Sequence, residues 1–212
     1  MYKFRLRMPL LYFPIQLVKD IIKRSKQRFQ PLYGLRLYCG KQGSGKTYSM
    51  IHDLIELVQK YPNVLVLSNM PIDYPCNIRY INSVYDITSP YNRGEQGTIV
   101  VLDEVQNFLC AGERNFPPEL LAEITQQRKQ HMCIMGTTQV FGRCSKELRE
   151  QTFKVIKPYT LFGCVTFYFD SDPIIRDGEI KDAISTVRWL GVQSEDVRGV
   201  YDSYKKPVIL SK

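Results

Sequence analysis

The stretch that most constrains the fold is GKQGSGKT, residues 40 to 47, which lies between a short apolar run and a helical pattern. Glycine at three of its eight positions lets the backbone take positive φ angles and approach a ligand without Cβ clashes. The N–H groups of such a loop point inward at a helix N-terminus, where the helix dipole adds positive potential. The stretch therefore predicts a site for the phosphates of a nucleotide.

The loop fits the pattern G-x-x-x-x-G-K-[ST] at every position. Lys46 is expected to reach the β- and γ-phosphates of ATP, and the Thr47 hydroxyl is expected to bind Mg²⁺. An ordinary glycine-rich turn would not require Lys-Thr at its end, so the motif favours ATP and Mg²⁺ as ligands. The predicted nucleotide-binding residues are Gly40, Lys41, Gln42, Gly43, Ser44, Gly45, Lys46, Thr47 and Tyr48.

Two acids follow the apolar run IVVL of residues 99 to 102. The carboxyl ends of strands are where α/β sheets bind ligands. Asp103 is expected to hold Mg²⁺, through a water molecule, and Glu104 is expected to deprotonate the attacking water. The pair predicts ATP hydrolysis and argues against a small P-loop kinase, because a kinase that activates water wastes ATP. The alternative interpretation is that Asp103 and Glu104 are only solvated acids at the end of a strand.

A further apolar run ends in MGTTQ, at the same predicted edge of the sheet. Gln139 is expected to sense the γ-phosphate or orient the water, with Thr138 assisting; strand-end capping is the alternative. Phosphoryl transfer also needs a cation, which a neighbouring subunit can supply as an arginine. The candidates near this strand are Arg128, Arg143 and Arg149, and Arg128 is the one predicted. Taken alone, each of the three is more typical of a surface arginine.

Strand-like and helical patterns alternate along the chain, which predicts βαβ units and a parallel sheet. Predicted strands cover residues 35–39, 63–69, 97–104, 131–139 and 152–158, predicted helices 47–59, 117–129 and 145–150, and residues 160–169 are read as part of a hairpin. Residues 70–97 read as loops with short elements. The fold class is α/β: a RecA-like P-loop NTPase with a mainly parallel central sheet flanked by helices, a C-terminal β-hairpin and an N-terminal amphipathic helix.

The positive charge of the chain is concentrated at its start. Residues 1–30 carry eight Lys or Arg against Asp20 alone, so they hold +7 of the net +8, and residues 31–212 hold +1. Apolar residues from Ile15 to Phe29 fill one side of a predicted helix, with Pro14 before it. Such a basic arm is suited to binding an anionic membrane surface or nucleic acid. The alternative is that its helix packs against the rest of the protein. The predicted division is a basic amphipathic arm, 1–30, and a P-loop ATPase domain, 31–212.

In order, these motifs resemble the ATPase domain of zonula occludens toxin (Zot)-like proteins, the gene I assembly proteins of filamentous phages, within the FtsK/HerA-like ATPases. The matching stretches are GKQGSGKT, LVLSNMPI with Ser68 and Asn69, VVLDEVQNF with Phe108, ELLAEITQQRKQ, LREQTFKVIKP and GVYDSYK with Tyr201, Asp202 and Ser203. The resemblance implies an oligomeric motor, such as a ring, that exports or packages viral or mobile-element DNA. Family members usually carry a transmembrane helix after this domain, which anchors them in the membrane. Here the basic arm could serve as the anchor, by binding the membrane surface or a membrane assembly partner.

The six cysteines form no CxxC pair and no zinc-type cluster with histidine, so we expect reduced thiols and a cytosolic setting. Together with the resemblance, this predicts the host cytoplasm, at the cytoplasmic face of the inner membrane. Two other functions stay open from the sequence: a small P-loop kinase, and a membrane-surface protein that uses the nucleotide only as a switch.

Overall fold

The computed structural model describes residues 13–25, 29–30, 33–88, 93–111, 116–176, 179–182, 186–202 and 205–211. Within them, eight strands form one sheet in the order β10-β7-β6-β1-β5-β4-β2-β3. Their bounds are β1 (Gly34–Cys39), β2 (Leu65–Ser68), β3 (Asn77–Tyr80), β4 (Thr98–Leu102), β5 (Met132–Thr138), β6 (Thr152–Leu161), β7 (Val165–Ser171) and β10 (Thr186–Val192). All neighbours from β6 to β3 pair in parallel, whereas β6–β7 and β7–β10 are antiparallel. The predicted mainly parallel sheet with a C-terminal hairpin is confirmed.

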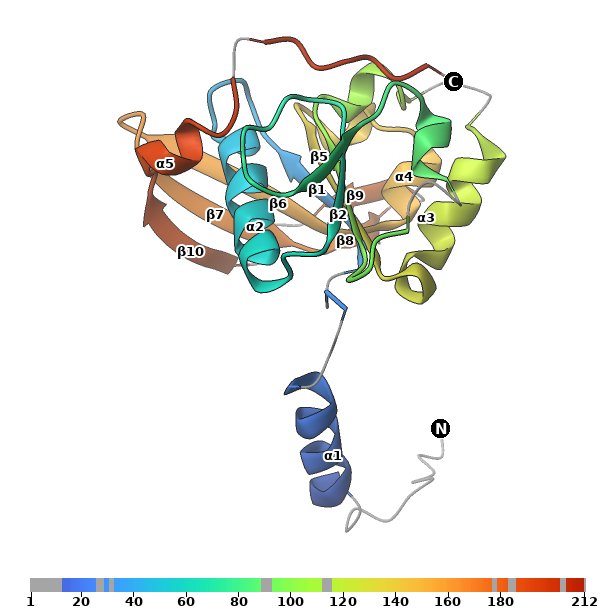
Figure 1. The fold of residues 1–212 in the computed structure, drawn as a ribbon. Helices are drawn as coiled ribbons and strands as arrows, with labels where there is room; N and C mark the ends of the chain where they lie inside the picture. Colours follow the sequence, from blue (N-terminus) through green and yellow to red (C-terminus); the bar gives the residue numbers. More distant parts are fainter. Residues whose placement is uncertain are drawn as a thin grey trace.

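Helices cover both faces of the sheet (Figure 1). One face packs against α2 (Lys46–Lys60) and α5 (Glu195–Arg198). The other packs against α3 (Pro118–Gln130), α4 (Lys146–Glu150) and the 3₁₀ turns η2 (Val84–Ile87), η3 (Val105–Asn107) and η4 (Phe141–Arg143). Every residue of β4 and β5 is buried, which explains why these strands read as continuous apolar runs rather than as alternating patterns.

The hairpin begins earlier in the chain than its alternating pattern suggests. Its first strand is β6, which extends the predicted strand of residues 152–158 as far as Leu161, and the turn lies inside the stretch 160–169. Phe162 and Gly163 take φ angles of 52° and 70°, and the Cys164 N–H closes the turn on the Leu161 carbonyl at 3.1 Å. A separate two-stranded sheet, β8 (Pro173–Arg176) with β9 (Glu179–Asp182), follows β7.

The predicted N-terminal helix is present as α1 (Phe13–Ser25), and residues 26–28 lie outside the described residues. Its described side chains, from Pro14 to Ile22, are all exposed, with Ile21 at 57%, and it stands apart from the sheet in Figure 1. The prediction that this helix reaches Phe29 is wrong: Phe29 lies in a bend, and its ring stacks on His131 with the ring centroids 3.9 Å apart. Among the described residues, no helix is both long and apolar enough to span a bilayer.

Candidate functional site

The loop of residues 40 to 45 joins the end of β1 to the start of α2, at the carboxyl edge of the parallel strands. Gly43 and Gly45 have φ angles of 76° and 91°, which a residue with a Cβ adopts only at an energetic cost. At Gly45 a Cβ would also lie 2.6 Å from Thr160 Oγ1. Glycine is therefore required at Gly45 by both the backbone angle and the packing.

The first turn of α2 has no side-chain cap, since the N-cap residue is Gly45. The first N–H groups of a helix have no carbonyl partner within the helix, and the dipole makes this end attractive to an anion. Lys46 is 7% exposed, and its Nζ donates to the Lys41 carbonyl at 3.2 Å, across the loop. The buried Ser44 Oγ contacts no hydrogen-bond partner among the described residues. Together these groups form a cradle suited to phosphate.

The two predicted magnesium ligands lie side by side. Thr47 Oγ1 is 3.4 Å from Asp103 Oδ1, and the Thr137 hydroxyl donates to the same oxygen at 2.6 Å. Carboxylate and hydroxyl oxygens are ligands that Mg²⁺ prefers, so the donor set fits this ion. Burial raises the pKa of Asp103, and the neighbouring Glu104 carboxylate raises it further, against the lowering effects of Thr137, Lys46 and Thr47. A cation here would favour the ionised carboxylate.

Glu104 is held in an uncommon backbone conformation directly after β4. Its φ and ψ are 55° and 50°, a left-handed conformation that costs a residue other than glycine on the order of 1 kcal/mol or more. Its N–H donates to Thr137 Oγ1 at 2.9 Å, and its carboxylate accepts a hydrogen bond from the Gln106 amide. The backbone thus turns sharply between the two acids, and Thr137 contacts both of them.

Two residues that support the acids come from neighbouring strands. Asn69, just beyond β2, accepts from the Asp103 N–H at 2.8 Å and donates to the Asp103 carbonyl at 3.1 Å. Thr137, on β5, was not predicted from the sequence, which indicated Thr138 instead. The Thr138 hydroxyl donates to the Val140 carbonyl at 3.2 Å. The adjacent threonines point to opposite faces of β5, and only Thr137 reaches Asp103.

A pocket of about 900 Å³ opens beside the phosphate loop. Gln139 lines it together with the loop residues 40–44, and so does Arg149. Its other wall is formed by residues 157–160 of β6 and by Phe169. The structure therefore brings Gln139 to the predicted site, and it brings Arg149 there rather than Arg128. The role predicted for Gln139 stays a prediction.

Two other predicted site residues face elsewhere. Arg128 lies in the last turn of α3, with its guanidinium carbon 5.5 Å from the centroid of the Tyr33 ring. That turn leads into the start of β5, so Arg128 is at the sheet edge opposite the phosphate loop of its own chain. Tyr48 is buried, and its hydroxyl accepts from the Ser194 N–H at 3.0 Å. Only its backbone amide, in the first turn of α2, belongs to the cradle.

Among solved structures, the chain is similar to the N-terminal domain of zonular occludens toxin from Neisseria meningitidis. The TM-score is 0.59 at 20% sequence identity, and the match covers 81% of this chain and 100% of that domain. The chain therefore shares its fold with that domain. The ATPase domain of the protein called G40P matches with a TM-score of 0.50 at 11% identity, covering 83% of this chain and 94% of that one.

The genome packaging NTPase B204 of Sulfolobus turreted icosahedral virus 2 matches with a TM-score of 0.46 at 14% identity, covering 73% of this chain and 98% of that one. No protein-family model matches the sequence, and no curated protein matches it either. At identities of 20% and 11%, the first two matches show the fold, and at that level they confirm the resemblance drawn from the motifs.

Proposed function

We propose that the chain is a Mg²⁺-dependent ATPase whose hydrolysis drives the export or packaging of viral or mobile-element DNA. The observation that carries the ATPase part is the pairing of an uncapped, glycine-turned helix N-terminus with the Thr47–Asp103 contact of 3.4 Å and the adjacent Glu104. These groups offer what an ATP-hydrolysing site requires: amides and a lysine for the phosphates, oxygens for the cation and a carboxylate for the water.

In the proposed reaction, water attacks the γ-phosphorus and the bond to the β,γ-bridging oxygen breaks, giving ADP and phosphate. Glu104 accepts the proton of the attacking water. Lys46 and the first-turn amides of α2 bind the β- and γ-phosphates, and Thr47 and Asp103 would hold Mg²⁺. When bound, the ion neutralises charge on the phosphate oxygens. Gln139, at the wall of the pocket, couples phosphate loss to movement of a neighbouring subunit.

The DNA part of the proposal rests on the order of motifs that resembles the Zot-like assembly ATPases. In the proposed function, the chain forms a homo-oligomer, such as a ring, which acts at the cytoplasmic face of the host inner membrane. The membrane part is supported by α1, whose exposed apolar residues share a helix with basic ones, a combination typical of helices that lie on anionic bilayers.

The test is ATP turnover with Mg²⁺, measured without DNA and with single- or double-stranded DNA. We expect DNA to stimulate turnover in the parent chain. Lys46→Ala should abolish turnover under all conditions, because the cradle loses its cation. Turnover of Lys46→Ala at the parent rate would contradict the proposed site.

The same assay separates the alternatives. A phosphorylated small-molecule product without DNA stimulation would identify a kinase. Slow hydrolysis unaffected by DNA, together with tight binding to anionic vesicles, would identify a nucleotide-switched membrane-surface protein. Either result would overturn the DNA-motor proposal.

A further inference from the structure

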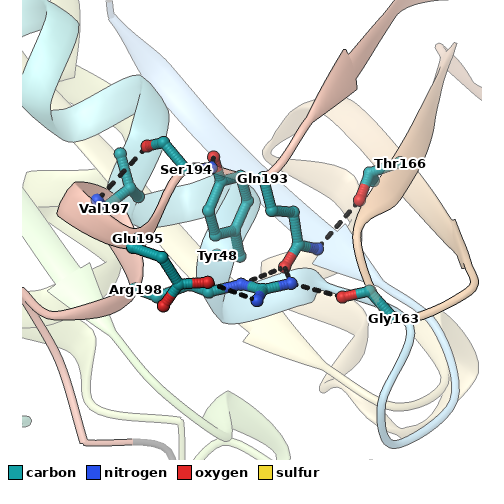
Figure 2. A network of polar contacts seen from close by, with 8 residues as sticks. All are labelled: Tyr48, Gly163, Thr166, Gln193, Ser194, Glu195, Val197 and Arg198. Carbon is teal, nitrogen blue, oxygen red and sulfur yellow. Dashed lines mark hydrogen bonds and ion pairs between the residues drawn. The ribbon is translucent and has the colours of Figure 1, made fainter.

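A partly buried polar network runs from the back of the phosphate loop to the turn of the β6–β7 hairpin and to α5. Its four side chains are Thr160 on β6, Thr166 on β7, Gln193 after β10 and Arg198 at the end of α5. Figure 2 shows Gln193 between Thr166 and Arg198, with Gly163 of the hairpin turn beside the guanidinium. None of the four was predicted from the sequence as a site residue.

At the loop, the network ends on one peptide group. Thr160 Oγ1 donates to the Ser44 carbonyl at 2.9 Å. The peptide between Ser44 and Gly45 is planar and trans, so its C=O and N–H point in opposite directions. Because the carbonyl is held toward β6, the Gly45 N–H is turned to the other side of the loop. The contact therefore fixes the direction of one amide in the cradle.

Behind Thr160, the direction of each hydrogen bond in the network can be assigned. Gln193 Oε1 accepts from Arg198 at two positions, from Nε at 3.1 Å and from Nη2 at 2.9 Å. The Gln193 Nε2 must then face the threonines, and it lies 2.8 Å from Thr166 Oγ1 and 3.3 Å from Thr160 Oγ1. The two hydroxyls are 2.8 Å apart. Since the hydrogen of Thr160 goes to Ser44, Thr166 is the donor between them.

The result is a one-way chain of donors from Arg198 through Gln193, Thr166 and Thr160 to the Ser44 carbonyl. A chain with a cation at one end polarises each following bond in the same sense. Thr166 is fully buried at 0% exposure, which shields this part from water. Arg198 is itself held by the Gly163 carbonyl and by Glu195 Oε1, the latter at 2.8 Å.

We infer that Gln193 and Arg198 are positioning residues for the phosphate loop: through Thr166 and Thr160 they orient the Ser44–Gly45 peptide for binding nucleotide phosphate. The inference rests on the proposed nucleotide site and deepens it. It concerns the phosphates alone, so it applies to diphosphate and triphosphate nucleotides with any base.

Thr166 offers a matched pair of variants in the full chain. Thr166→Val keeps the volume and removes the hydroxyl, and Thr166→Ser keeps the hydroxyl. We expect Thr166→Val and Gln193→Ala to weaken the binding of fluorescent ADP and ATP analogues about five- to tenfold, as for the loss of about one buried hydrogen bond. Thr166→Ser should bind as the parent does. KM should rise with little change in kcat, because the loop holds the phosphates before and during the reaction.

Asp196→Asn is the control within α5, because this residue is exposed and, among the described residues, forms no hydrogen bond or ion pair with the four network side chains. We expect parent affinity for this variant. Parent affinity of both Thr166→Val and Gln193→Ala would overturn the inference, and so would equal losses in Thr166→Ser or Asp196→Asn. If Thr166→Val fails to fold, Gln193→Ala decides.

A second readout needs no nucleotide. The NMR signal of the Gly45 amide in the free protein should shift in Thr166→Val and Gln193→Ala, and stay in place in Thr166→Ser. An unchanged Gly45 signal in Thr166→Val and Gln193→Ala would overturn the positioning role. A parent chain that binds no nucleotide yet shows the expected shifts would refute the proposed function and leave the orientation of the peptide established.

Discussion

At the scale of single residues, Thr137 links the two acids of the candidate site. Its hydroxyl donates to Asp103 Oδ1 at 2.6 Å and accepts from the Glu104 N–H at 2.9 Å. One side chain therefore orients the carboxylate that would hold Mg²⁺ and fixes the sharp backbone turn that presents Glu104. Loss of a group that orients a metal ligand in this way typically costs about 10- to 100-fold in metal affinity or activity.

Thr137→Val should lower kcat of the proposed ATP hydrolysis about 10- to 100-fold, because valine keeps the volume and leaves Asp103 and the Glu104 N–H without their common partner. The measurement is steady-state ATP turnover over a range of Mg²⁺ concentrations, where we also expect a higher Mg²⁺ requirement.

Thr152→Val is the matched control for this change. Thr152 is also a buried threonine, and its hydroxyl donates to the Leu148 carbonyl at 2.8 Å, away from the acids. Equal losses of kcat in the two variants would show that Thr137 acts through general packing and not by linking the two acids.

The sequence predicted the acids and the phosphate loop because their residue types and spacing are diagnostic on their own. It could not choose between Thr137 and Thr138, because β5 is buried on both faces and its composition does not reveal which face meets the site. The left-handed backbone of Glu104 was equally hidden, since glutamate has no preference for that conformation. The four side chains behind the loop come from separate elements that only the fold brings together.

At the scale of elements, the central strands were predictable and the edge strands were not. Strands β2, β4 and β5 are buried along their whole length, so their apolar residues stand out in the sequence. By contrast, β3 (Asn77–Tyr80) has no buried residue, so it carries no apolar signal, and it lies in the stretch read as loops. The strand β10 was missed too. It is an edge strand held by antiparallel pairing with β7, a long-range contact that local sequence does not encode.

The helix α1 makes a prediction of its own, because its exposed apolar residues are proposed to enter a bilayer surface. Ile21→Ser should weaken binding of the full chain to vesicles containing anionic lipid by roughly tenfold or more, as expected from losing one buried apolar side chain. The measurement is the fraction of protein that sediments with the vesicles.

Gln16→Ser is the control on the polar side of α1, and it leaves the net charge unchanged as Ile21→Ser does. We expect it to bind vesicles as the parent chain does. Should Ile21→Ser bind equally well, the apolar face of α1 would have no part in membrane binding.

At the scale of the whole molecule, the excess positive charge and the candidate site lie in different parts of the chain. The first 30 residues hold +7 of the net +8, whereas the candidate site lies on the sheet, at the carboxyl edge of β1 and β4. The mainly parallel sheet flanked by helices followed from a phosphate loop and alternating strands and helices. The placement of α1 apart from that sheet (Figure 1) did not, because an amphipathic helix looks the same in sequence whether its apolar face meets a protein core or a membrane.

The central claim is that water, activated by Glu104, cleaves ATP held at the phosphate loop. The most direct test is a single-turnover measurement of phosphate release with Mg²⁺, made on the parent chain and on Glu104→Gln, with ATP affinity measured in parallel. The variant keeps the size of the side chain and an oxygen that can accept from Gln106. We predict parent affinity and phosphate release slower by about 100-fold or more. Release at the parent rate, or a parent chain that binds Mg²⁺ and ATP without releasing phosphate, would contradict the account.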